Sequence, residues 1–93
     1  MQRSVSEREL DDGPEKPRAG FVRFQQGLAR QALVRGSLGA ARLALRVLRP
    51  RDFAGGEPVC GRYLDTLRNF RAAEQEIVDA VRALIDMSPA CDE

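Results

Sequence analysis

The side chains best suited to chemistry in this sequence are the arginines of its first half. Residues 16–51 contain nine cations and no carboxylate, although the formal net charge of the whole chain is only +1. A guanidinium group forms bidentate hydrogen bonds with phosphate and carboxylate groups. A segment that carries only positive charge predicts a partner of negative charge. Three such partners are considered: a nucleic acid, an anionic membrane and the acidic remainder of the chain.

Four arginines of this segment recur close to helical spacing and are the candidate contacts for a nucleic acid: Arg35, Arg42, Arg46 and Arg49. From one strip of a helix they would neutralise phosphates of a nucleic-acid backbone. No aromatic residue stands between Phe24 and Phe53 to stack on a base, and there is no clear helix-turn-helix pattern. A nucleic-acid-binding regulator is therefore kept as the alternative hypothesis.

The distribution of charge along the chain favours the chain's own acidic remainder as the partner. Residues 16–51 have a net charge of +9, whereas residues 1–15 have −3 and residues 52–93 have −5. If the basic segment packs beside the acidic C-terminal half, charge selects the register of the helices. Apolar burial must then supply the stability, because exposed ion pairs contribute little.

Residues on which enzymes and metal sites depend are scarce. The chain has no histidine, which is the commonest general base and a frequent metal ligand. Two cysteines alone cannot hold a structural zinc ion, and the glycine-containing segments "GSLG" and "AGGEP" match no phosphate-binding loop. We therefore expect a non-enzymatic protein with no catalytic residues, no metal site and no cofactor.

The elements that must position these side chains are predicted to be helices. In the first, which starts near Ala19, one apolar face contains Phe21, Phe24 and Leu28. The segment "RGSLG" then interrupts the pattern with two glycines and offers Ser37 as an N-cap. We expect a break there.

A second helix is predicted over 38–49, ended by the proline that follows it. A single bent helix over 20–49 is the alternative to two separate helices.

The last predicted helix is the longest, from about residue 59 to residue 87, after a loop that contains Gly55 and Gly56. Its apolar residues recur at spacings of three and four residues, as on one face of a helix, and Glu74 occupies one of these positions. A carboxylate that faces an apolar seam needs a partner. We expect Glu74 either to fix the register or oligomeric state, or to extend harmlessly to the edge of the seam.

These elements predict an all-α fold, either a small antiparallel helical hairpin or a three-helix arrangement with a long C-terminal helix. Residues 1–18 are expected to be a flexible tail and residues 19–90 a helical interaction domain. The apolar faces are too broad to be hidden against one another, so oligomerisation or a partner should complete the fold.

The leading hypothesis is therefore a small protein–protein interaction module, an assembly subunit or adaptor that binds a protein partner or forms a homo-oligomer. The predicted interface consists of Leu38, Leu45, Leu48, Leu67, Phe70, Glu74, Ile77, Val81 and Leu84. No apolar run approaches the roughly 18 residues of a membrane span, and the N-terminus has no apolar core of a secretory signal. We expect a soluble, intracellular protein, most simply cytoplasmic.

Overall fold

Four α-helices make up the part of the chain, residues 18–90, that the computed structural model describes. The elements are α2 (Ala19–Val34), α3 (Leu38–Leu45), a short 3-10 helix η2 (Pro50–Asp52), α4 (Val59–Arg68) and α5 (Glu74–Asp86). Within this range there is no strand, only an isolated bridge between Phe53 and Pro89. The prediction of an all-α protein is confirmed. The tail expected over 1–18 lies outside the described residues, apart from Arg18.

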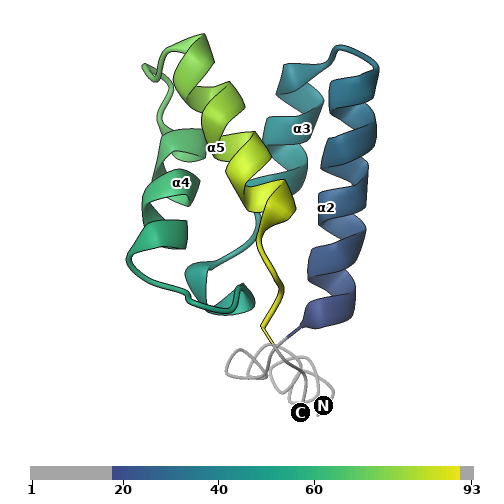
Figure 1. Ribbon diagram of the computed structural model, residues 1–93. Coiled ribbons are helices and arrows are strands. Elements are labelled where there is room, and N and C mark those ends of the chain that lie inside the picture. Colours follow the sequence, from purple (N-terminus) through teal and green to yellow (C-terminus); the bar gives the residue numbers. More distant parts are fainter. Residues whose placement is uncertain (1–17, 91–93) are drawn as a thin grey trace, which may run out of the picture.

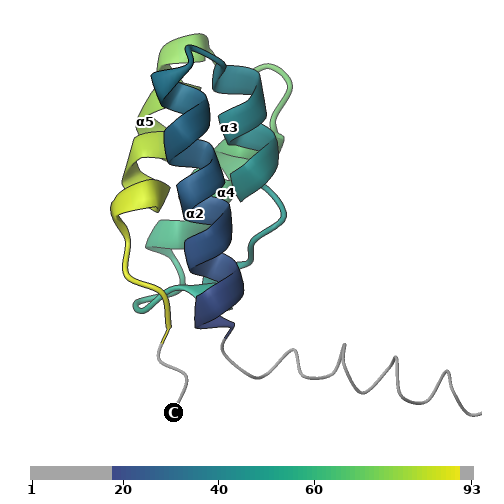
Figure 2. The ribbon, with the colours of Figure 1, turned by 90° about the vertical axis from the view of Figure 1, so that its right-hand side faces the viewer.

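The helices form two antiparallel hairpins. Figure 1 shows α2 beside α3 with a short turn between them, and α4 beside α5 with their connection at the same end of the molecule. After a rotation of 90°, the α2–α3 hairpin faces the viewer, with α4 behind it and α5 to one side (Figure 2). Each hairpin therefore has one side against the other hairpin and one side turned away from it.

The break between the first two helices is confirmed, and the single bent helix over 20–49 is excluded. Gly36 has a φ of +80°, a left-handed conformation that glycine adopts without strain. The N–H groups of Gly36 and Ser37 donate to the carbonyls of Leu33 and Ala32, which is a Schellman motif. The Ser37 hydroxyl then accepts the N–H of Ala40 at 3.3 Å and caps α3. Helix α3 ends at Leu45, before the predicted end at residue 49.

The single long helix predicted over 59–87 is wrong, because the chain leaves the helix after Arg68 and enters a new one at Glu74. The side-chain oxygen of Asn69 accepts the N–H of Arg71 at 2.9 Å, a local turn that competes with helical hydrogen bonding. The carboxylate of Glu76 accepts the N–H of Ala73 at 3.1 Å and stabilises the first turn of α5. The predicted hairpin of one long helix against residues 20–49 is thus replaced by two short hairpins.

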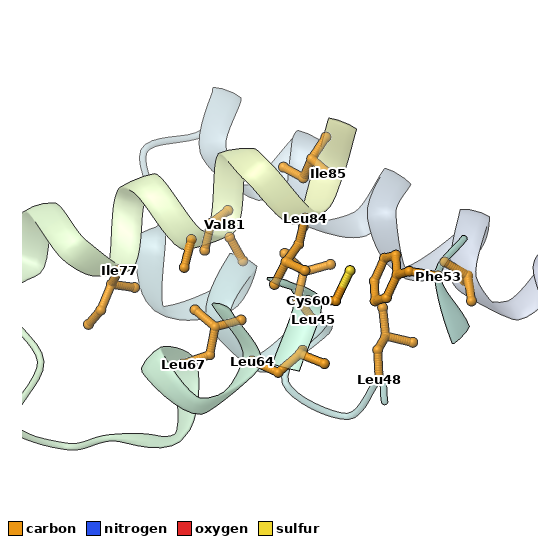
Figure 3. Packing of buried hydrophobic residues seen from close by; sticks show 14 of the residues in the cluster. Leu45, Leu48, Phe53, Cys60, Leu64, Leu67, Ile77, Val81, Leu84 and Ile85 are labelled. Carbon is orange, nitrogen blue, oxygen red and sulfur yellow. The ribbon is translucent and has the colours of Figure 1, made fainter. Parts of the chain in front are cut away.

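The hydrophobic core lies between the two hairpins and is formed by one chain (Figure 3). Leu45, Leu64, Leu67 and Leu84 meet there with no exposed surface. Helix α2 contributes mainly small side chains to this core, including Val22, Ala29 and Ala32. Small side chains allow two helix backbones to approach closely, so α2 sits tightly against its neighbours.

Polar contacts hold the C-terminal segment against the start of the fold. The main chain of residues 88–90 pairs with that of residues 52–54 through two hydrogen bonds of 2.9 Å, Ala54 N–H to Ser88 and Ala90 N–H to Asp52. The buried amide of Gln26 on α2 donates to the carbonyls of Leu84 and Met87, at 2.8 and 2.9 Å. These bonds give donors to two carbonyls at the end of α5, of which that of Leu84 also accepts the N–H of Met87 at 3.4 Å.

Truncation of a core leucine should destabilise the isolated chain. We expect Leu84→Ala to lower the free energy of unfolding by about 2–5 kcal/mol, because it leaves a cavity between the hairpins. Leu43→Ala, at a position that is 58% exposed, is the matched control, and should change this free energy by no more than about 0.5 kcal/mol. Urea denaturation followed by circular dichroism measures both values. Equal effects of the two substitutions would contradict this core.

Candidate interaction site

Most residues predicted to contact a partner are instead buried inside the chain. Five of them have no exposed surface and a sixth is 7% exposed: Leu45, Leu48, Leu67, Val81, Leu84 and Ile77. Leu38 is partly buried against the same cluster. Leu45 and Leu48 lie on and just after α3, the other four lie on α4 and α5, and the two hairpins cover these side chains between them. The prediction of a partner interface at these positions is therefore wrong, although Phe70 remains 85% exposed.

Glu74 lies exposed at the first position of α5 and not in an apolar seam. The rhythm that places it in a seam assumes a continuous helix through residues 69–73, and the chain is not helical there. Carboxylates in the first turn of a helix are stabilised by the partial positive charge of the helix N-terminus. Glu74 is thus a residue of a helix start, and its predicted role in register or oligomeric state loses its basis.

Two arginines bind the C-terminal ends of each other's helices. Arg42 of α3 donates from Nε to the carbonyl oxygen of Leu67, near the end of α4, at 2.7 Å. Arg68 of α4 donates from Nη2 to the carbonyl oxygens of Arg46 and Leu48, just beyond α3, at 2.9 and 2.8 Å. Carbonyls at a helix C-terminus lack partners and carry partial negative charge. These reciprocal hydrogen bonds, from Arg42 to α4 and from Arg68 to the end of α3, join the two hairpins.

A buried aspartate connects the start of α2 to η2. Arg18, which precedes α2, forms a bidentate pair with Asp52, with Nε–Oδ1 at 3.0 Å and Nη2–Oδ2 at 2.7 Å. The backbone N–H of Arg49 donates to Oδ2 at 2.8 Å, and the Nε of Arg49 lies 3.9 Å from the same oxygen. The Asp52 side chain has no exposed surface, whereas the side chains of Arg18 and Arg49 are 32% and 33% exposed.

These contacts decide the charge of Asp52. Burial alone would raise its pKa, but the hydrogen bonds from Arg18 and the Arg49 backbone, together with the charges of both arginines, lower the pKa below its ordinary value. The hydrogen bond to Asp52 raises the pKa of Arg18, against the opposing effect of burial. The pair is therefore ionised at neutral pH, and a buried charge is compensated on all sides.

The strip of four exposed cations predicted for a nucleic acid is not formed. Arg42 and Arg49 are engaged within the chain, as described above. Arg35 and Arg46 are exposed, but they lie just before and just after α3, whose eight residues separate them by about 12 Å. Among the described residues, the predicted pairing of the basic segment with the acidic C-terminal half is found at Asp52, which pairs with Arg18 and Arg49. Within the described residues, the segment's arginines between 23 and 49 make no ion pair with a carboxylate of α5.

An apolar face stays exposed on the outer side of the α2–α3 hairpin, and we call it the hairpin face. It consists of Phe21, Phe24 and Leu28 on α2 with Leu43 and Val47 on and after α3, which are between 40% and 63% exposed. The amide of Gln25 donates to the carbonyl of Ala44 at 2.6 Å and so places the two helices side by side. Between them, Leu28 and Leu43 line an open groove of about 560 Å³.

No catalytic constellation accompanies this face. In residues 18–90, no three histidine, cysteine, aspartate or glutamate side chains gather as a metal site would require. Cys60 is a buried free thiol. Burial, together with the charge of Glu57, raises its pKa, so it stays protonated and weakly nucleophilic. The chemistry available at the hairpin face is therefore that of apolar contact and of charge.

Comparisons of the chain with models of protein families, with curated proteins and with solved structures return no match. Among the described helices, none combines the length and the apolar character that crossing a membrane requires.

Sequence reasoning misses Arg18, Asp52 and the exposure of the hairpin face. Arg18 is assigned to the tail, and Asp52 is given no role. One signal was available for Asp52, since it is the first carboxylate after 36 residues without one. For Phe24 no signal in the sequence distinguishes an exposed aromatic residue from a core residue, because α2 has apolar side chains on its buried side and on its exposed side.

The Arg18–Asp52 pair makes the stability of the protein depend on pH. The pKa of Asp52 is lowered in the folded state, so its contribution is fully present above the unfolded value of about 4 and is lost as pH falls through the folded value. Asp52→Asn should lower the free energy of unfolding at pH 7 by about 2–4 kcal/mol, somewhat less than for a fully buried pair because Arg18 stays partly hydrated.

Urea denaturation at several pH values tests this prediction. The difference between the wild type and Asp52→Asn should narrow as the pH falls below about 4. A difference that stays constant down to acid pH would show that Asp52 acts through its shape rather than its charge.

The hydrogen bonds that Arg68 donates to carbonyls of the first hairpin predict a second effect on stability. Arg68→Gln should lower the free energy of unfolding by about 1–2 kcal/mol, because two carbonyls lose a charged donor. Arg62→Gln, at an exposed position on the same helix, is the matched control and should have little effect. Thermal denaturation of both variants gives the comparison, and equal midpoints would argue against the capping role of Arg68.

Proposed function

We propose that the protein is a non-enzymatic helical interaction module, an adaptor or assembly subunit, that binds a protein partner through the hairpin face. One observation carries the proposal: Phe24 and Leu28 are 63% and 45% exposed, although the core is closed without them. A cluster of exposed apolar side chains marks an interaction site in soluble proteins. Phenylalanine is also enriched in protein–protein interfaces.

The shape of the hairpin face suits a protein partner. Two helices lie side by side, and the groove between them has small residues, Ala40 and Ala44, beside the larger Leu28 and Leu43. A helix or an extended segment of another protein can place its apolar side chains in such a groove. The face lies on the side of the hairpin turned away from α4 and α5, so binding requires no opening of the core.

Nucleic-acid binding has less support from this geometry. Arg42 and Arg49 are engaged inside the chain, and the two exposed candidates, Arg35 and Arg46, lie beyond the two ends of α3. The surface between these two is apolar, and a phosphate backbone gains nothing from contact with Phe24 or Leu28. A protein partner uses both the apolar side chains and the cations around them.

Site-specific photo-crosslinking in the cell that produces the protein tests the proposal. A photoreactive phenylalanine analogue in place of Phe24 or Leu43 should give the same discrete protein adduct, because both side chains would lie in one interface. The same analogue at Val59, which is 49% exposed on α4, is the matched control. It should give no such adduct.

Two outcomes would contradict the proposal. One is the absence of any discrete adduct at Phe24 and Leu43, or equal adducts at all three positions. The other is sub-micromolar binding to duplex DNA or RNA at about 150 mM salt that is lost in an Arg35→Gln, Arg46→Gln variant of unchanged thermal midpoint. The second result would establish the nucleic-acid hypothesis in its place.

A further inference from the structure

We infer that the occupant of the hairpin face is an acidic amphipathic helix of a partner protein. This inference rests on the proposed function and adds the chemical class of the partner. It follows from three features of the face: the sign of the charge around it, the shape of the groove and the position of its polar groups.

Charge around the hairpin face is positive. Arg35 lines the same groove as Leu28 and Leu43, and Arg23 lines an adjoining depression with Phe24 and Leu28. Arg46 is exposed and follows Leu43 by three residues, about one helical turn. Neither α2 nor α3 contains a carboxylate. Carboxylates of a partner would therefore meet several cations and no like charge on these two helices, which favours association and selects the partner.

The shape of the groove fits about two turns of a helix. Its shorter wall, α3, has eight residues, which corresponds to a length of about 12 Å at 1.5 Å per residue. The small side chains of Ala40 and Ala44 leave space for a leucine-sized side chain from the partner between Leu28 and Leu43. A helix with apolar residues at positions i, i+3 or i+4, and i+7 can fill this groove, and its acidic flanks would then reach the surrounding arginines.

A second copy of this chain fits the face poorly. In a twofold contact between two hairpin faces, the three arginines of one copy would face those of the other, and like charges oppose such a contact. The acidic outer side of α5 is no better, because its exposed residues include Gln75, Glu76 and Asp79 and form no apolar ridge. Neither the hairpin face nor the outer side of α5 therefore offers a surface that complements the groove.

An anionic membrane is also less suitable than a helix. Gln31 and Ser37 line the groove together with the apolar side chains. Hydrocarbon would remove water from these polar groups without providing hydrogen bonds, which costs free energy. A protein partner can supply donors and acceptors at the same places, and a ridge of its side chains can enter a concave groove.

Two synthetic helical peptides of about 18 residues are the probes for a test with the full-length protein. Both carry leucine at the i, i+3, i+4, i+7 spacing, and one has glutamate and the other lysine at the flanking positions. By fluorescence anisotropy, the glutamate peptide should bind at least about 10-fold more tightly than the lysine peptide at about 50 mM salt. This ratio should shrink at about 500 mM salt, as the charges are screened.

Variants of the protein separate apolar contact from charge. Phe24→Ser with Leu28→Ser should weaken binding of the glutamate peptide by more than about 10-fold, because these side chains form the apolar half of the contact. Arg23→Gln with Arg35→Gln should weaken it by about 3- to 10-fold and reduce its dependence on salt. The matched controls, Val59→Ser for apolar contact and Arg62→Gln for charge, are exposed positions on α4 and should leave binding unchanged.

Equal affinity for the two peptides would overturn the inference, and so would binding of the glutamate peptide that Arg23→Gln with Arg35→Gln does not alter. Vesicles of phosphatidylcholine and phosphatidylserine in equal parts are the third probe. Binding to them through Phe24 and Leu28, without binding to either peptide, would assign the face to a membrane and overturn the inference as well. If crosslinking at Phe24 still yields a protein adduct, the proposed function survives and only the acidic class of partner is wrong.

Discussion

Helix α2 packs closely against its neighbours through small side chains, and this packing fixes which of its residues face outward. Val22 and Ala29 are fully buried, and they let the backbone of α2 approach the neighbouring helices more closely than larger residues would. Only one side of the helix can make this approach. The larger Phe24 and Leu28 therefore remain on the outer side of the hairpin. The hairpin face is thus a direct consequence of how the core is packed.

The same packing explains why a segment of one charge occurs in a nearly neutral protein. Two of its arginines bind oxygen atoms of the fold that lie far away in the sequence: Arg18 binds a buried carboxylate and Arg42 the end of α4. A carboxylate beside Arg42 would compete for its guanidinium group. Those cations that the fold does not use, among them Arg23 and Arg35, surround the hairpin face. One composition therefore supports both the fold and the proposed choice of partner.

Helical class and the first break could be predicted, because Gly36 and Ser37 act through local backbone geometry. The second break could not be predicted. The helical spacing of the apolar residues continues from Leu67 through Phe70 to Ile77, with Glu74 at one of the expected apolar positions, although the helix itself ends at Arg68. That coincidence led to a long helix and to an interface made of core residues. The partners of Arg42 and Arg68 are main-chain carbonyls, which no pattern of charged side chains reveals. Which side of α2 is buried depends on how closely its neighbours can approach. Hydrophobicity alone favours burial of Phe24 and Leu28, which are exposed, over Val22 and Ala29, which are buried.

Under the proposed function, the hairpin face contributes to binding and not to the fold. The most direct test is the free energy of unfolding of the Phe24→Ser, Leu28→Ser variant, measured by urea denaturation beside the wild type. A value within about 1 kcal/mol of the wild type is expected, because both side chains are largely exposed in the native state. A loss of more than about 3 kcal/mol, the size of a core truncation, would show that these residues belong to the core and would contradict the account.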